Sequence, residues 1–213
     1  MVGAEPGGES LLDVSRPLTA ATPVWPGDRR LELGTMVDGS TRISWFSGTC
    51  HLGTHLDAPL HFDPSGAPVE RGALDRLVGP ADVLRLDGAR GTIAADALPQ
   101  GWRPGAPRLL LRTDSWPLGE PVGPGFAALS VELVERLHGL GVVTVGLDTP
   151  SVDPFESTTH EAHLRLAGLG MTWIEGLWLG AVEPGRYELI ALPLALVGVE
   201  AAPVRAVLRR RGE

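Results

Sequence analysis

Four side chains that can bind a metal ion lie close together in the segment from residue 51 to residue 61. They are His51, His55, Asp57 and His61. All four have odd numbers, so an extended chain would point them toward the same face. Imidazole nitrogen and carboxylate oxygen together suit zinc, manganese or iron. The segment therefore indicates a metal site and leaves the identity of the metal open.

A straight strand cannot bring these ligands to one ion. At roughly 3.3 Å per residue it would separate His51 from His55 by about 13 Å, whereas ligand bonds are near 2 Å. We therefore expect the chain to curl. Gly53 can adopt backbone conformations closed to other residues, and Pro59 interrupts regular strand pairing. Cys50 is expected to be neither ligand nor nucleophile, because alternation turns it away from the odd-numbered face.

A second group of possible ligands occurs further along the chain. His160 and His163 are three residues apart, so they would be neighbours on one face of a helix. Glu175 interrupts an apolar segment, and a carboxylate buried there needs a partner such as a metal ion. Spacing alone does not say which of the two histidines would join the site.

The elements that must position these residues are mostly short strands. A helix is predicted over 131–137 with Ser130 as its N-cap, a second over 159–166, and a weaker third over 74–77. Strands outnumber helices, which predicts one β-rich α/β domain over residues 11–213, preceded by a disordered leader at residues 1–10. Segments rich in valine, leucine and isoleucine predict strands at 41–47, 82–87, 108–113, 142–147, 173–179, 187–192 and 203–209.

The amino-acid composition of the chain limits the kinds of partner that it can bind. A net charge of −8 and a pI near 5.2 argue against binding to nucleic acid or to an anionic membrane. We expect a cytoplasmic protein, because the sequence shows no signal peptide, no membrane-spanning apolar run and a single cysteine. All 18 cationic side chains are arginines, which excludes a mechanism that depends on a catalytic lysine.

The segment HLGTHLDAPLHF at 51–62 resembles the hallmark of the metal-dependent cyclase-like hydrolases, a family that includes bacterial kynurenine formamidases and isatin hydrolases. The resemblance spans residues 11–209 and is greatest for the formamidase branch. It implies a swivelling β/β/α fold, a homodimer, and two divalent metal ions per subunit, usually zinc, with manganese also possible. The branch is indicated by further segments that follow the formamidase order, at 22–28, 147–154, 174–179, 187–194 and 203–209.

The resemblance also implies roles for individual residues. Asp57 would bridge the two metal ions, His61 would be the general acid and base, and Trp25 would pack on the aromatic substrate. The family pattern of Ser-Lys before Ala-His departs here, because Thr158 stands in place of the lysine. Alignment through Ala162 makes His163 the helical ligand. The metal ligands implied are His51, His55 and Asp57 for one ion, with His163 and Glu175 completing the pair.

The activity implied is hydrolysis of an N-formyl anilide by a metal-activated water. The leading case is the arylformamidase reaction of tryptophan degradation, in which N-formyl-L-kynurenine gives L-kynurenine and formate. The missing lysine leaves a substituted formylkynurenine equally open. One alternative is an isatin-type lactam hydrolase of the same family, which uses the same metal residues. The other is a non-catalytic metal-binding member, against which the presence of His61 and Glu175 argues.

Overall fold

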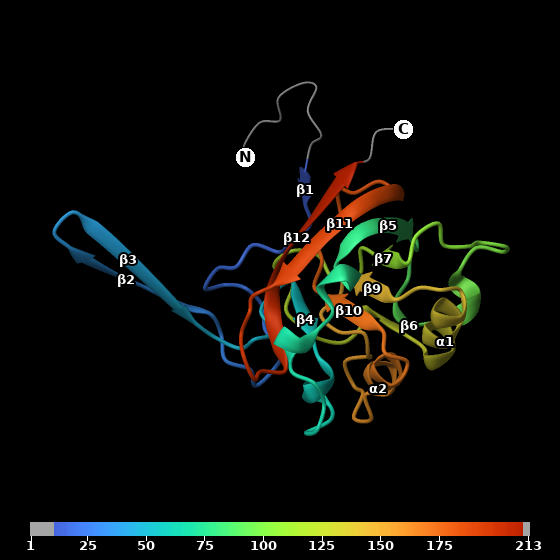
Figure 1. Ribbon diagram of the computed structural model, residues 1–213, viewed down its shortest axis with the longest axis horizontal. Helices are drawn as coiled ribbons and strands as arrows, with labels where there is room; N and C mark the ends of the chain where they lie inside the picture. The colour runs from blue at the N-terminus through green and yellow to red at the C-terminus, as the bar shows by residue number, and fades with distance from the viewer. Residues whose placement is uncertain (1–10, 211–213) are drawn as a thin grey trace.

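The fold of this protein is given by a computed structural model that describes residues 11–210, so the leader predicted at 1–10 lies outside the described residues. Its main sheet has the strand order β1-β12-β11-β5-β7-β9-β10-β4, and β4 pairs again with β12. Seven of these strands therefore close into a barrel, with β1 added beside β12 (Figure 1). The strands are β1 (Leu11–Asp13), β4 (His55–Asp57), β5 (Val78–Arg85), β7 (Arg108–Arg112), β9 (Thr144–Leu147), β10 (Thr172–Glu175), β11 (Gly185–Pro193) and β12 (Ala201–Arg210).

Two small sheets and a few helices complete the domain. Strands β5, β7, β9 and β10 run parallel, and the two α-helices lie in the connections of this parallel part. Within residues 11–210, no helix is both long enough and apolar enough to cross a membrane. The remaining elements are β2 (Glu32–Asp38) with β3 (Thr41–Ser47), β6 (Gly91–Ile93) with β8 (Ala127–Leu129), α1 (Val131–Gly139), α2 (Glu161–Gly168), and the 3-10 turns η1 (Pro59–His61), η2 (Val69–Arg71), η3 (Leu74–Arg76) and η4 (Ala95–Ala97).

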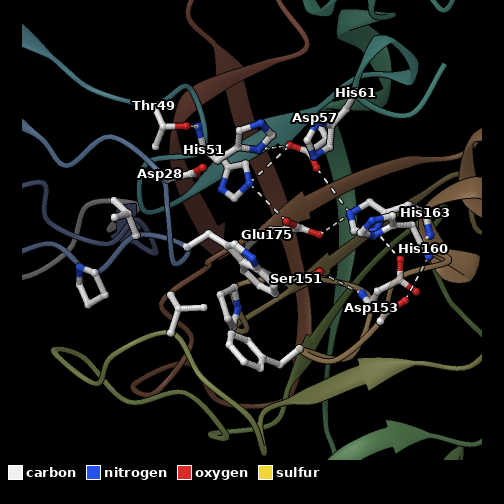
Figure 2. Close-up of a pocket in the computed structure, with 18 of the residues that line it drawn as sticks. Asp28, Thr49, His51, Asp57, His61, Ser151, Asp153, His160, His163 and Glu175 are labelled. Carbon is white, nitrogen blue, oxygen red and sulfur yellow. Dashed lines mark hydrogen bonds and ion pairs between the residues drawn. The ribbon is translucent and has the colours of Figure 1, made fainter. Parts of the chain in front are cut away.

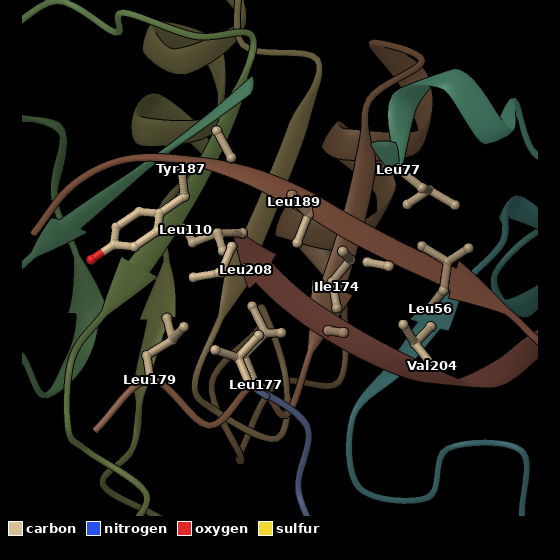
Figure 3. Packing of buried hydrophobic residues seen from close by; sticks show 14 of the residues in the cluster. Leu56, Leu77, Leu110, Ile174, Leu177, Leu179, Tyr187, Leu189, Val204 and Leu208 are labelled. Carbon is tan, nitrogen blue, oxygen red and sulfur yellow. The ribbon is translucent and has the colours of Figure 1, made fainter. Parts of the chain in front are cut away.

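Two apolar cores lie on the two sides of the barrel wall. Strand β7 is buried along its whole length, and its side chains alternate between the cores. Leu110 packs inside the barrel, in the cluster drawn in Figure 3. Leu109 and Leu111 pack outside it, in the cluster that contains the buried faces of α1 and α2. Because both sides of the strand are buried, the middle of β7 is an unbroken run of leucines.

The expected β-rich α/β class is confirmed, and most predicted elements are present. The cap of α1 is also confirmed, because the Leu133 N–H donates to Ser130 Oγ at 3.1 Å. The strand predicted over 173–179 is wrong beyond Glu175. Gly176 has a φ of 66°, and a Cβ there would overlap the Gly53 carbonyl oxygen. Residues 74–76 form a 3-10 turn in place of a third α-helix.

Strands β2 and β3 form a hairpin that projects from the body (Figure 1). We call residues 32–47 the arm. Only β3 was predicted, because β2 contains Gly34 and charged residues at both ends. The two strands pair antiparallel in full register, from Glu32 opposite Ser47 to Asp38 opposite Thr41.

Candidate metal centre

The segment with most of the predicted ligands runs into β4, the strand that bridges β10 and β12. His55 lies opposite Glu175 in β10, and Asp57 lies opposite Ala201 in β12. The chain turns just before β4 at Gly53, whose φ of 59° favours glycine. The expected curl is therefore present at Gly53. The short strand that follows was not predicted.

Asp57 lies at the centre of a group of converging side chains (Figure 2). Its Oδ1 atom is 3.0 Å from Nδ1 of His51 and 3.4 Å from Nε2 of His55. Its Oδ2 atom is 3.5 Å from Nε2 of His163. Because this carboxylate is buried among three imidazoles, its two oxygen atoms can contact different binding partners at the same time.

Glu175 supplies a second buried carboxylate on the other side of the same group. Its Oε2 atom is 3.3 Å from Nε2 of His55, and its Oε1 atom is 3.0 Å from Nε2 of His163. Oε1 also accepts a hydrogen bond of 2.7 Å from the Val152 N–H. The fold thus brings together the two ligand groups that are far apart in the sequence.

Hydrogen bonds fix which ring nitrogen of two histidines faces the centre. Nδ1 of His55 lies 3.1 Å from the Gly53 carbonyl oxygen, which can only accept, so Nδ1 carries the proton. Nδ1 of His163 likewise donates to Oδ2 of Asp153 at 2.5 Å. Both Nε2 atoms are consequently left to face the carboxylates of the centre. This is how metal-binding histidines are held in proteins, with the outer nitrogen donating to an oxygen.

Asp153 orients His163 through the backbone of α2 as well as through the ring. Its carboxylate accepts hydrogen bonds from the N–H groups of Ala162 at 2.9 Å and His163 at 3.3 Å. The residue at the N-cap position, His160, has a φ of 50° and its side chain makes no capping hydrogen bond. Asp153 therefore satisfies the first turn of α2 from outside the helix. Sequence reasoning gave it no role, because it stands several residues before the helix.

The electrostatics of the centre follow from burying charges of both signs together. Burial opposes protonation of His51, but the close contact with Asp57 and the charges of Asp57, Glu175 and Glu200 raise its pKa to about 9. Burial opposes protonation of His163 too, yet Glu175, Asp153 and Asp57 raise its pKa well above the ordinary value.

The two central carboxylates shift in the opposite direction. Burial would raise the pKa of Asp57, but the neighbouring imidazoles of His55, His163 and His51 hold it well below its usual value. The pKa of Glu175 is lowered as well, since His163 and His55 outweigh burial and the charge of Asp57. The site thus favours ionised carboxylates beside positive charge.

A divalent cation fits this donor set. Among the described residues, Asp57 Oδ1 is buried without an acceptable hydrogen bond, because the nearby imidazoles do not align with it. A buried, unsatisfied carboxylate oxygen is costly, and a metal ion would supply its missing partner. Nitrogen and oxygen donors in this ratio suit zinc or manganese.

The grouping of the ligand atoms differs in part from the one implied by the resemblance. Asp57 belongs to two groups whose ligand atoms lie within 4.8 Å of one another, as expected for a bridging carboxylate. His51, however, groups with His61 and not with His55. The groups are His51 with Asp57 and His61; His55 with Asp57 and Glu175; and Asp153 with His160 and His163.

His61 lies at the exposed edge of the centre. Its ring centroid is 4.4 Å from that of His51 and 6.3 Å from that of His163. Partial burial lowers its pKa, and although Asp57 and Glu175 oppose this, the neighbouring His51 and His163 lower it further. A neutral imidazole at the edge can accept a proton from the pocket side.

Two residues near the centre take no part in its core. His160 is exposed, and its ring centroid is 6.3 Å from that of His163. Cys50 is half-buried and is not among the residues that line the pocket described below, in agreement with the expected orientation. Burial, and then the charge of Glu200, raise the pKa of its thiol.

The centre forms the floor of a cavity of about 650 Å³. Apolar side chains also line the cavity, among them Trp25, whose ring centroid is 5.1 Å from that of Phe155 and 6.4 Å from that of Phe126. The volume lies within the range of small-molecule sites. The other apolar lining residues are Pro23, Val24, Phe62, Trp116, Val122, Pro150 and Pro154.

Among residues 11–210, the cavity is lined by two carboxylates outside the candidate metal centre and by no arginine side chain. Glu200 lies 3.4 Å from Nε2 of His51, and its side chain is 38% exposed. Asp28 also lines the cavity (Figure 2), and within residues 11–210 its carboxylate has neither a hydrogen bond nor an ion pair. Sequence reasoning assigned no role to either residue.

Comparison with known proteins identifies a family and a set of similar structures. The model of the family described as putative cyclase matches residues 12–154. A potential metal-dependent hydrolase with cyclase activity is 28% identical, with a TM-score of 0.81 over 97% of this chain and 100% of its own. A predicted metal-dependent hydrolase from Bacillus stearothermophilus is also 28% identical, with a TM-score of 0.82 over 96% of this chain and 100% of its own.

An isatin hydrolase bound to the product analogue thioisatinate has the same fold. It is 21% identical to this chain, with a TM-score of 0.79 over 95% of this chain and 92% of its own. At this identity the likeness concerns the fold alone. The fold of these proteins therefore supports the β-rich α/β domain described above.

Proposed function

We propose that this chain, a metal-dependent hydrolase of the cyclase family, hydrolyses N-formylated aromatic amines, with N-formyl-L-kynurenine as the leading substrate. The observation that carries this proposal is the cavity itself. Buried histidines and carboxylates line it together with tryptophan and phenylalanine side chains. An aromatic ring would rest on the aromatic side chains while its amide group reaches the histidines and carboxylates.

The floor would hold two divalent metal ions, most simply zinc. The residues that would hold them are His51, His55, Asp57, His163 and Glu175. When bound, such ions lower the pKa of water and polarise a carbonyl oxygen. The chain contributes the orientation of the ligands, because Gly53 and Asp153 hold the outer nitrogens of His55 and His163.

His61 would move the proton of the reaction. Its neutral ring can accept a proton from the attacking water and return it to the aniline nitrogen as the C–N bond breaks. The water oxygen and its second proton end in formic acid, which releases that proton to solvent and becomes formate, and the transferred proton ends on the amine, so atoms balance without a covalent intermediate on the protein. Among the six histidines, His61 suits this role because it lies at the exposed edge between centre and cavity.

The charge of the cavity wall favours a substrate with an ammonium group. Asp28 and Glu200 are acidic, and no arginine lines the cavity. The amino-acid side chain of formylkynurenine has an ammonium group, which could pair with these carboxylates. Isatin has no ammonium group, so an isatin-type lactamase has no use for them. This difference supports the formamidase over the alternative of the same family.

The test is turnover of purified, metal-loaded protein on formylkynurenine and on isatin in parallel. We expect formate and kynurenine from the first and little ring opening of the second, with activity abolished by a chelator and restored by zinc or manganese. Preference for isatin would refute the substrate. Absence of turnover on both, with metal bound, would favour a non-catalytic metal-binding protein.

Asp28→Asn tests the ammonium contact separately. It should raise KM for formylkynurenine, because a paired ammonium loses its carboxylate, and it should leave KM for N-formylaniline unchanged. An exposed carboxylate in the turn η4, Asp96, supplies the matched control as Asp96→Asn. An equal rise of KM for both substrates would contradict the contact.

A further inference from the structure

A buried arginine contacts one of the aromatic residues that line the cavity. Arg16 is 6% exposed and is not itself a lining residue. Its guanidinium carbon lies over the indole of Trp116, 3.7 Å from the ring centroid. Such stacking of a guanidinium on an aromatic face is attractive, and more so where water is excluded. Because Trp116 lines the cavity, Arg16 contacts the cavity wall without reaching the cavity.

The same side chain holds the backbone beside that indole. We call residues 113–126 the wall loop, because this segment joins β7 to β8 and brings Trp116 to the cavity. Nη2 of Arg16 donates to the carbonyl oxygens of Trp116 at 2.5 Å and Asp148 at 3.1 Å. Nη1 donates to the carbonyl oxygen of Pro117 at 3.4 Å. One guanidinium thus fixes both the ring and the backbone of Trp116.

The charge of Arg16 has no acidic partner to offset its burial. In the described part of the chain no carboxylate forms an ion pair with it, and its Nε is buried without a hydrogen bond. The carboxylate of Asp148 is engaged by the N–H groups of Thr113 at 2.9 Å and Asp114 at 2.8 Å, where the wall loop begins. Burial lowers the pKa of Arg16 to about 10, against the charge of Asp148, so the guanidinium stays charged at neutral pH. Since an unpaired buried charge is costly, stability alone does not account for this arginine.

The backbone of Arg16 is tied to the segments that contain the proposed metal ligands. Its N–H donates to Thr54 Oγ1 at 2.9 Å, and the Thr54 hydroxyl donates to the Gly176 carbonyl oxygen at 2.7 Å. Thr54 precedes His55 and Gly176 follows Glu175 in the chain. Arg16 therefore joins the metal centre, through its backbone, to the wall loop, through its side chain.

We propose that Arg16 is a positioning residue that holds Trp116 at a fixed distance from the metal centre and so makes the cavity selective for formamides of aromatic amines. This inference rests on the proposed function, because the ring to be held belongs to that substrate. The indole Nε1–H donates to the Glu120 carbonyl oxygen at 3.0 Å, so the ring and its loop move together. Trp116 shares an apolar cluster with Phe126, against which Trp25 packs. A shift of Trp116 would therefore displace the aromatic surface on which a substrate ring rests.

The test compares Arg16→Met with Arg108→Met in metal-loaded protein. Arg108 is the matched control, because it is 7% exposed, also donates to backbone carbonyl oxygens, and does not line the cavity. Arg16→Met keeps the backbone N–H to Thr54, so metal content and kcat should be preserved. KM for N-formylaniline should rise by about 10-fold, while the inhibition constant of formate, which has no ring, should not change. Arg108→Met should leave all four quantities as in the wild type.

A measurement without substrate separates this inference from the proposed function. Hydrogen exchange of the Trp116 indole N–H, followed by NMR, should be faster in Arg16→Met and unchanged in Arg108→Met. Faster exchange in a protein that does not turn over N-formylaniline would support the positioning role and reject the substrate. If Arg16→Met does not fold, Arg16→Lys decides: it keeps the charge but has one nitrogen where arginine uses two, so KM and exchange should change in the same direction by less. A folded variant with wild-type exchange, wild-type KM or an equal loss of affinity for formate would overturn the proposal.

Discussion

Asp153→Asn separates the orientation of a metal ligand from the stability of the fold. In the wild type the carboxylate accepts a hydrogen bond of 2.5 Å from Nδ1 of His163 and caps α2 through the N–H groups of Ala162 and His163. Asparagine is nearly as good a helix cap as aspartate, so most of the capping survives the change. The negative charge beside the His163 imidazole, however, is lost in the mutant.

The expected cost falls mainly on metal binding. Loss of a carboxylate that orients a metal-binding histidine typically weakens metal affinity by about 10- to 100-fold, or roughly 1.4 to 2.7 kcal/mol. The pH dependence of stability should change as well. Burial would raise the pKa of Asp153, but His163 and the Ala162 N–H lower it below its usual value. An acid with a lowered pKa stabilises the fold above its ordinary pKa and loses that contribution as the pH falls through the lowered value. The mutant deficit should therefore be present at neutral pH and disappear in acid.

Metal affinity is measured by competition with a chromophoric chelator, and stability by urea unfolding. The matched control is Ser130→Ala, which removes the cap of α1, a hydrogen bond that involves neither His163 nor α2. It should cost about 1 kcal/mol of stability and leave metal affinity unchanged. If Asp153→Asn lowers stability like the control but keeps wild-type metal affinity, Asp153 is a helix cap and the orienting role is wrong.

Three further changes test individual residues. His61→Ala should lower kcat by a factor of about 10² to 10⁴ with metal content preserved, and metal loss in proportion to activity would make His61 a ligand. Trp25→Ala should raise KM for formylkynurenine while unfolding stays cooperative, and a folded mutant with unchanged kinetics would exclude the contact. The thiol of Cys50 should be alkylated with a midpoint above the ordinary pKa of a cysteine thiol, because burial and then Glu200 raise its pKa, and labelling should spare turnover. A midpoint below that value, or inactivation on labelling, would contradict this.

The parts of the fold that could be predicted are those in which local sequence and burial agree. Helix α1 has a capping serine, a periodic apolar face and glycines behind it, and the structure has it where predicted. Strand β7 is apolar on both faces because both faces are buried. Strand β4 could not be found in this way. It has only three residues, and it is a strand because β10 and β12 pair with it from either side.

Some residues of the candidate site could likewise be predicted from the sequence, and others could not. Candidate ligands that cluster in sequence, such as His55 and Asp57, could be proposed from spacing and residue type, and the structure brings these two side chains together. Asp153, Asp28 and Glu200 could not, because each is a single acidic residue in a loop whose neighbours come from distant segments. Their positions depend on how the barrel closes.

Closure of the barrel and assembly of the centre are linked through β4, which completes the barrel and contains His55 and Asp57. In the absence of a cation, Asp57 leaves a buried oxygen without a hydrogen bond in that strand. Metal binding should therefore stabilise the native state, by about 2.7 kcal/mol when free metal is 100 times its dissociation constant. Removing the metal with a chelator should lower the urea midpoint and speed hydrogen exchange of the β4 amides more than those of β7. If metal loss is verified and neither quantity changes, the centre does not contribute to closing the barrel.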